Sequence, residues 1–126
     1  MKKIFLLTGV GMILFSFCLF NNQDGIINAL KAGNVEQVAT YFDTFIDLTL
    51  PGRDEIKNMD KHHATIVLKS FFEENGINGF EPISQREAGA IMYMTGKLQG
   101  KSKSYNLTLL LKNKDGKHQI ISVRIN

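Results

Sequence analysis

Apolar residues recur at helical spacing in two parts of the chain. Across residues 24–42 they form a stripe that Gly33 and Asn34 interrupt. Glycine commonly ends one helix and asparagine commonly caps the next, so we predict two short helices here. A second stripe over residues 58–75 predicts one longer amphipathic helix that ends at Gly76. Its apolar positions are Ala64, Val67, Leu68, Phe71 and Phe72.

A two-residue alternation replaces the helical spacing elsewhere. Residues 45–50 alternate up to a Pro51-Gly52 turn, which predicts a short strand. Four later segments alternate or are rich in strand-forming residues: 79–84, 88–98, 104–112 and 117–125, separated by turns at 85–87, 100–103 and 113–116. We expect them to form an antiparallel meander. On the second of these strands Ala88, Ala90, Met92, Met94 and Leu98 share one face, and this face should pack on the helices.

The size and composition fit one globular domain. The chain has 126 residues, of which 44% are hydrophobic and 21% charged, values typical of a single folded unit. We therefore predict one α+β domain over residues 21–126. In it, N-terminal helices and one long amphipathic helix pack on an antiparallel sheet.

The first twenty residues have a different character. Lys2 and Lys3 precede an uncharged, apolar run over residues 4–20, which is the pattern of a secretory signal. We therefore interpret residues 1–20 as a signal peptide or an N-terminal anchor. The protein is expected to be exported in a bacterium, either to the periplasm or as a membrane-anchored protein.

The position of the cut depends on Cys18, the only cysteine in the chain. Cleavage after it would start the mature protein near Leu19 and leave no thiol for disulfides or metal binding. A lipidated cysteine in bacterial lipoproteins follows a small residue, whereas Phe17 precedes Cys18 here. The sequence therefore favours a cleaved or anchored secretory protein over a lipoprotein.

Charge narrows the choice of partner. Without Lys2 and Lys3 the chain has 13 basic and 12 acidic side chains, which gives a net charge of +1. The last thirty residues are nevertheless basic and contain one acid, Asp115; their basic residues are Lys97, Lys101, Lys103, Lys112, Lys114, Lys117 and Arg124. Lysine on an exposed strand usually serves solvation and edge protection. We therefore expect no nucleic-acid partner, and we keep binding to an anionic surface as an alternative.

The order of elements and several short segments resemble the nuclear transport factor two-like superfamily of cystatin-like folds. The resembling segments are 29–34, 39–42, 64–72, 96–98 and 120–125. Within that superfamily the chain is similar to small exported bacterial domains of unknown function. The resemblance implies a strongly bent sheet wrapped around the long helix as a cone. It also implies an open end that binds small molecules or proteins in different relatives, and frequent dimers through the sheet.

The matching positions are apolar, small or turn-forming, so the resemblance transfers no functional residue. A fold of this kind also hosts many unrelated functions. Candidate chemistry therefore has to come from the residues themselves.

The adjacent pair His62-His63 is the first candidate. Neighbouring helical residues point about 100° apart, so the two rings cannot bind one metal from one face. Positions 66 and 67 are Ile and Val, which leaves a zinc-binding pattern incomplete. We predict no metal site.

Acidic residues are the second candidate. Asp43 and Asp47 lie near the first predicted strand, and either could act as a general base in the lumen of the cone. Hydroxyl donors would come from Tyr41, Tyr93 or Tyr105. The opposing interpretation is that Asp47 faces water and that the tyrosines belong to the core with solvated hydroxyls.

Several large apolar residues are candidates for lining a pocket. They are Phe71, Phe72, Phe80, Met92 and Met94, and methionine and phenylalanine often line adaptable apolar sites. The same spacing is typical of a filled core. The sequence leaves both interpretations open.

We expect a non-catalytic, exported binding or interaction domain that needs no cofactor. Its partner would be a protein, a small apolar ligand or a second copy that docks through the sheet, and its N-terminal segment could associate with a membrane. One alternative is a small lumenal enzyme of the isomerase or dehydratase type that uses Asp43 or Asp47. The other is anionic-surface binding by the lysine-rich C-terminal hairpin.

Overall fold

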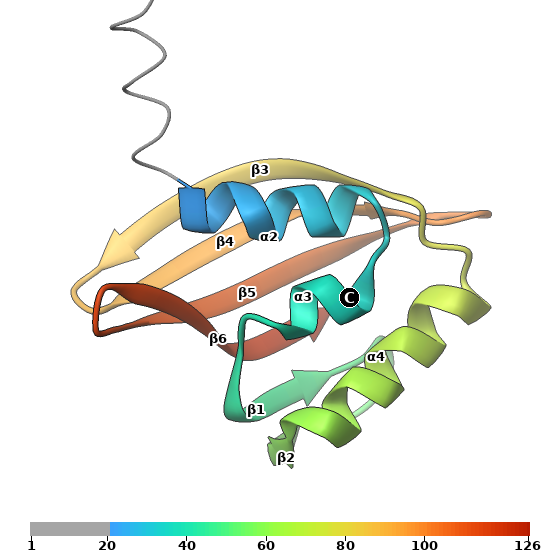
Figure 1. Ribbon diagram of the computed structural model, residues 1–126. Coiled ribbons are helices and arrows are strands. Elements are labelled where there is room, and N and C mark those ends of the chain that lie inside the picture. The colour runs from blue at the N-terminus through green and yellow to red at the C-terminus, as the bar shows by residue number, and fades with distance from the viewer. Residues whose placement is uncertain (1–20) are drawn as a thin grey trace, which may run out of the picture.

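The computed structural model describes residues 21–126, and the predicted signal segment 1–20 lies outside the described residues (Figure 1). Helices α2 (Asn21–Lys31) and α3 (Val35–Ala39) come first. Strands β1 (Phe42–Thr49) and β2 (Ile56–Asp60) then lead into the long helix α4 (Lys61–Glu74). The chain ends with β3 (Gly79–Ala88), β4 (Ile91–Gln99), β5 (Ser104–Lys114) and β6 (Lys117–Ile125). The predicted α+β class is confirmed.

All six strands form one sheet in the order β2-β1-β6-β5-β4-β3. The predicted meander of the last four strands is confirmed, because β3, β4, β5 and β6 pair in antiparallel fashion in chain order. The sheet is not antiparallel throughout, however, since β1 pairs with β6 in parallel. The backbone N–H of Ile120 donates to the carbonyl oxygen of Tyr41 (2.7 Å) where the two strands meet.

The helices cover one side of the sheet. Figure 1 shows α2 lying across β3 and β4, and α4 lying across β1 and β2, on the same side. The core fills the space between the helices and this inner face; its largest fully buried side chains include Ile26, Leu30, Ile46, Met94, Leu109 and Leu111. Burial of each large apolar side chain contributes about 1.5–3 kcal/mol.

The predicted break between the two N-terminal helices is confirmed. Gly33 has a φ of 67°, and a Cβ added there would lie 2.8 Å from the carbonyl oxygen of Ile77. Asn34 then caps α3, because its Oδ1 accepts a hydrogen bond from the backbone N–H of Gln37 (3.1 Å). The helical pattern ends earlier than predicted, since Phe42 already begins β1.

The predicted start of the long helix is wrong. Residues 56–60 form β2, and α4 begins only at Lys61. Asn58 has a φ of 55°, a left-handed conformation that no helix continues through. Asp60 caps α4 by accepting a hydrogen bond from the backbone N–H of His62 (3.0 Å). The predicted end is confirmed within two residues, at Glu74, with Gly76 at a φ of 61°.

The predicted turn at residues 85–87 is also wrong. These residues extend β3, and the reversal into β4 occurs at Gly89 and Ala90. Every residue from Glu81 to Ala88 is exposed, so this edge strand has no buried face that would produce an alternation. Ala88 and Ala90 are likewise exposed and do not belong to the packed face, whereas Met92, Met94 and Leu98 are buried as predicted.

Candidate functional site

The outer face of the sheet, turned away from the helices, contains a depression of about 550 Å³. Its apolar members come from three strands: Phe45 from β1, Leu110 from β5 and Ile121 from β6. Tyr93 lies beside them, and Phe45 and Tyr93 are 55% and 38% exposed. We call this surface the outer-face depression. Its charged members are Asp47, Glu55 and Arg124.

Asp47 and Tyr93, two of the predicted catalytic candidates, therefore meet in the outer-face depression and not under the helices. Oδ1 of Asp47 accepts a hydrogen bond from the backbone N–H of Asn58 (3.0 Å). The β1–β2 register shifts at this point, so two β2 residues, Lys57 and Asn58, lie opposite the single β1 residue Asp47. Asp47 thus holds a β-bulge in β2.

Two further candidates, Asp43 and Tyr41, lie elsewhere. Oδ1 of Asp43 accepts a hydrogen bond from the backbone N–H of Thr44 (2.8 Å) and lies 3.4 Å from Nζ of Lys114. The hydroxyl group of Tyr41 packs directly against Gly25 of α2, where a Cβ would collide with it. The Asp43–Lys114 ion pair therefore links the start of β1 to the end of β5. The Tyr41 contact packs α2 against the segment before β1.

The five pocket-lining candidates separate into two groups. Phe80, Met92 and Met94 are at most 5% exposed and belong to the core. Phe72 is also buried but reaches the lining of a groove at one end of the domain, and the half-buried Phe71 lines a groove along α4. The apolar stripe of α4 thus predicted core residues, and its members Val67, Phe71 and Phe72 also line concave surfaces.

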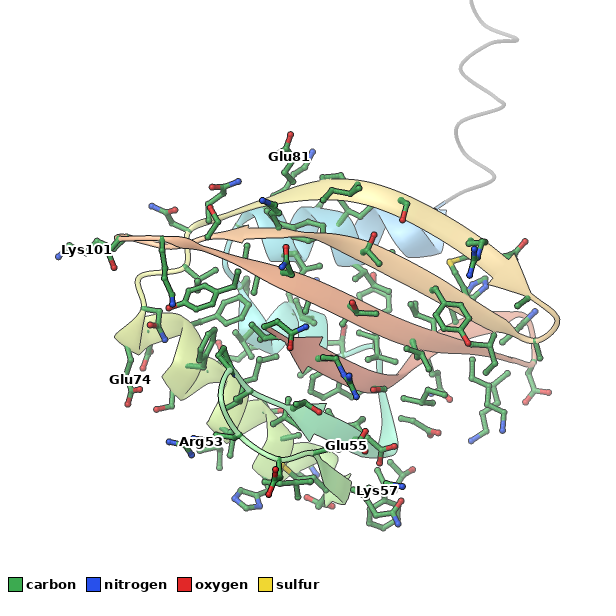
Figure 2. All side chains as sticks on the ribbon, turned by 180° about the vertical axis from the view of Figure 1, so that it is seen from behind. Arg53, Glu55, Lys57, Glu74, Glu81 and Lys101 are labelled. Carbon is green, nitrogen blue, oxygen red and sulfur yellow. The ribbon has the colours of Figure 1, made fainter. Side chains whose placement is uncertain are left out.

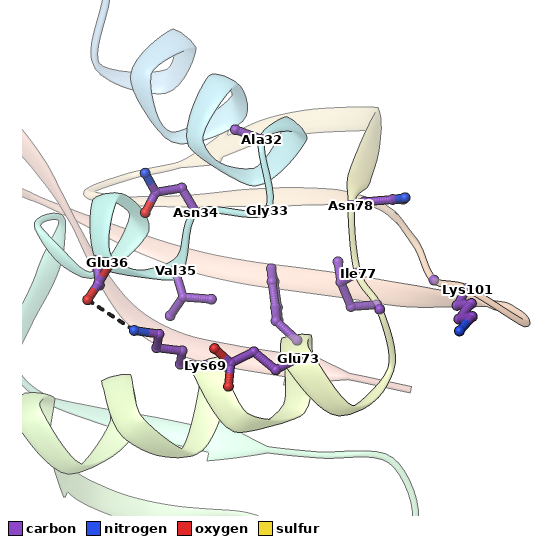
Figure 3. Close-up of a pocket in the computed structure, with 13 residues that line it drawn as sticks. Ala32, Gly33, Asn34, Val35, Glu36, Lys69, Glu73, Ile77, Asn78 and Lys101 are labelled. Atoms are coloured by element: carbon purple, nitrogen blue, oxygen red, sulfur yellow. Dashed lines mark hydrogen bonds and ion pairs between the residues drawn. The ribbon is translucent and has the colours of Figure 1, made fainter.

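The groove at the end of the domain has a volume of about 950 Å³ and lies between the α2–α3 connection and the C-terminal end of α4 (Figure 3). Nζ of Lys69 lies 3.2 Å from Oε2 of Glu36 and bridges α4 to α3. Figure 3 shows Glu73 beside Lys69, while Lys101 points away at the far end. Acidic and basic groups alternate around this opening, so it presents no single charge.

The histidine pair lies at the start of α4. Both His62 and His63 are exposed, and the backbone of His62 is engaged by the Asp60 cap. Within residues 21–126 there is no group of three His, Cys, Asp or Glu side chains that could hold a metal ion.

The basic residues of the last thirty do not form one patch. Lys101 and Lys103 lie at the β4–β5 turn, whereas Lys112, Lys114 and Lys117 lie at the β5–β6 turn. These turns are at opposite ends of β5, which has 11 residues. At about 3.4 Å per residue the two groups are on the order of 30 Å apart.

Sequence reasoning missed the outward apolar residues. Leu110 stands between the buried Leu109 and Leu111, and Ile121 follows the buried Ile120. A strand with two-residue periodicity turns one of two adjacent residues outward. The runs Leu109-Leu110-Leu111 and Ile120-Ile121 were therefore a readable signal that the outer face also carries apolar side chains.

The family model described as "Domain of unknown function (DUF4783)" matches residues 23–126. The chain belongs to the DUF4783 family. No curated protein matches the chain. Within residues 21–126, no helix combines the length and apolar character that crossing a membrane requires.

Solved structures of DUF4783 proteins share the fold. The Bacteroides ovatus protein is 25% identical, with a TM-score of 0.73 over 80% of this chain and 90% of that one. The Bacteroides uniformis protein is 21% identical, with a TM-score of 0.75 over 82% of this chain and 94% of that one.

A more distant structure supports the wider resemblance. An NTF2-like protein of unknown function from Cytophaga hutchinsonii is 12% identical, with a TM-score of 0.54 over 81% of this chain and 82% of that one. The resemblance to the nuclear transport factor two-like superfamily is therefore confirmed at the level of the fold.

Proposed function

We propose that this DUF4783 chain is an exported, non-catalytic binding domain that pairs with a second copy of itself through the outer-face depression. The observation that supports this most directly is the exposure of Phe45 and Tyr93 above the half-buried Leu110 and Ile121. Aromatic side chains surrounded by polar groups are typical of interface centres. Covering them would remove apolar area from water.

The charges of the depression suit a self-complementary contact. A two-fold interface brings the same patch of both copies together. Arg124 and Glu55 line the same depression. A two-fold axis that passes midway between them would therefore place the arginine of each copy opposite the acid of the other. A patch of one sign would instead repel its copy.

Both edges of the sheet are unsuited to strand addition, which supports contact through the face. The edge strand β3 contains Pro82 and a register shift between Pro82 and Ser84. The other edge strand, β2, has five residues and the bulge at Asn58. Proline, bulges and short length are the usual means by which edge strands avoid pairing.

The two acidic candidates give the enzyme hypothesis little support. Asp47 organises the β2 bulge and Asp43 contacts Thr44 and Lys114. A general base needs an approachable substrate position beside it, whereas both carboxylates already have structural partners. The separation of the lysines into two groups likewise weakens the hypothesis of a single anionic-surface site.

Export remains part of the proposal on the basis of the N-terminal sequence alone. Lys2, Lys3 and the apolar run to residue 20 have the composition of a secretory signal. The domain would then act in the bacterial periplasm, or at the membrane if the segment is retained as an anchor.

Sedimentation velocity of protein purified after expression of the full chain tests the pairing. We expect a dimer for the wild type and a monomer for Phe45→Asp, because the new carboxylate would be buried at the contact. Ile83→Asp is the matched control, since Ile83 is 61% exposed on the edge strand β3 and lies outside the depression. A monomeric wild type at every concentration, or equal effects of both variants, would contradict the proposal.

A further inference from the structure

A groove and a slot lie next to one another between α4 and the β1–β2 connection. The groove, of about 580 Å³, is bordered by Phe71 and Tyr105. The slot, of about 160 Å³, lies under the connection and is lined by Leu48, Ile56 and Met59. Leu50, Arg53 and Val67 line both. We call the two together the side groove, and its inner part the slot.

The slot is suited to an alkyl chain. Five of its lining side chains are aliphatic or thioether groups, namely Leu48, Leu50, Ile56, Met59 and Val67. Ile56 is 52% exposed and Leu50 and Val67 are half-buried, so apolar surface is left in contact with water at the mouth. An apolar chain that entered the slot would cover this surface.

The outer part of the side groove has an ordered polar wall. The hydroxyl of Tyr105 donates to Oδ1 of Asn75 (2.9 Å), and Nδ2 of Asn75 donates to the carbonyl oxygen of Phe71 (2.9 Å). The Phe71 and Tyr105 rings meet edge to face with centroids 5.2 Å apart. Nζ of Lys103 lies 5.0 Å from the Tyr105 ring centroid. This cation–π contact keeps the Lys103 charge at the rim of the side groove.

Two cations and one acid line the outer part: Arg53, Lys103 and Glu74. Oε2 of Glu74 accepts a hydrogen bond from the hydroxyl of Ser70 (3.3 Å), whereas neither Arg53 nor Lys103 takes part in an ion pair among the described residues. The slot itself is lined by two further charged or titratable residues, Asp54 and His63. The outer part therefore carries two cations against one acid beside a mostly apolar slot, and Asp54 adds a second acid to the side groove as a whole.

We propose that the side groove binds a single-chain fatty acid, with its alkyl chain in the slot and its carboxylate at Arg53 and Lys103. Arg53 stands where the two parts join, and a guanidinium group binds a carboxylate through two parallel hydrogen bonds. A fatty acid whose alkyl chain enters the slot beside Arg53 places its carboxylate next to the guanidinium group.

This site is distinct from the outer-face depression. Figure 2 shows Arg53 beside α4 and Glu55 on the other side of the β1–β2 connection. Glu55 lines the depression, whereas Arg53 lines the side groove. Pairing through the depression and fatty-acid binding in the side groove can therefore be tested independently of one another.

Calorimetric titration of protein purified after expression of the full chain tests the proposal, with dodecanoate as the probe. We expect saturable binding of one dodecanoate, about tenfold weaker binding of methyl dodecanoate, which lacks the charge, and no binding of acetate, which lacks the chain. Amide NMR shifts on addition of dodecanoate should centre on Leu50, Arg53 and Val67.

Two variants separate the side groove from non-specific binding. Arg53→Gln should weaken dodecanoate binding about tenfold, while Lys57→Gln removes an exposed cation of β2 outside the groove and should leave binding unchanged. Phe45→Asp should also bind dodecanoate normally. Equal binding of acid and ester, equal effects of Arg53→Gln and Lys57→Gln, or NMR shifts centred on another surface would overturn the proposal.

Discussion

The carboxylate of Asp47 in β1 accepts a hydrogen bond from the backbone N–H of Asn58 in β2, with the two atoms 3.0 Å apart. Asn58 is in the left-handed region, with a φ of 55°, and its amide lies at the bulge where the β1–β2 register shifts. The side chain of Asp47 thus replaces a ladder hydrogen bond that the bulge removes. Asp47, a catalytic candidate on sequence grounds, therefore stabilises the bulge of the edge strand β2.

Asp47→Ala should therefore destabilise the domain by about 1 kcal/mol, the usual net value of one such hydrogen bond. Asp47→Asn should retain most of the stability, because its amide oxygen can still accept from Asn58. Urea unfolding of the two variants measures the difference. Asp54→Ala, in the exposed β1–β2 connection, is the control, and an equal loss in Asp47→Ala and Asp54→Ala would contradict this role.

Gly96→Ala should destabilise the domain by about 1–3 kcal/mol through overpacking. A Cβ at this buried position of β4 would meet the ring of Phe80 and lie 2.6 Å from the carbonyl oxygen of Glu81. Combining Gly96→Ala with Phe80→Leu removes the ring from the collision. The double variant should lose less stability than the sum of the two single variants, and strict additivity would show that the ring is not the cause.

Tyr105→Phe should cost about 1 kcal/mol, because it leaves Oδ1 of Asn75 without the hydroxyl donor that it now has. The matched control is Tyr93→Phe on the exposed outer face, for which we expect a change near zero. Thermal unfolding followed by circular dichroism compares the two. A stable Tyr105→Phe protein would mean that the wall of the side groove does not depend on this hydrogen bond.

The mature N-terminus tests the export proposal. Intact-mass spectrometry of the protein from its native cells should give a chain that starts at Leu19 or close beyond it. The uncleaved mass, recovered with the membrane fraction, would support the anchor instead. A diacylglyceryl mass on Cys18 would show that Phe17 does not prevent lipidation, and an uncleaved cytosolic protein would contradict export altogether.

The α4 and β4 segments illustrate how far the sequence alone leads. Ala64, Leu68 and Phe72 are buried on one side of α4, and Met92, Met94 and Leu98 on one side of β4. Each set repeats at the period of its own backbone. Where one face of an element is buried, the sequence repeats at the period of that element, and these buried residues were predicted correctly. The exposed Ala88 and Ala90 were wrongly assigned to the same face of β4.

The errors occur where burial does not dictate the residues. Strand β2 has one buried residue, Met59, and β3 has one, Phe80. Each is an edge strand that forms because backbone groups of its neighbour are available, so its side chains need not alternate. The parallel β1–β6 pair had no local signal either, since it joins segments about 75 residues apart in the chain.

The sequence by itself determined the α+β class, the helix break at Gly33 and Asn34, and the burial of Met92, Met94 and Leu98 on one face of β4, because local backbone preference and burial periodicity act over a few residues. Only the tertiary structure decided that Asp47 and Tyr93 share the outer-face depression with Arg124, and that Arg53 stands between an apolar slot and Lys103. These groups come from strands and turns distant in the chain. Their proximity depends on strand order and bulge register, which no local pattern encodes.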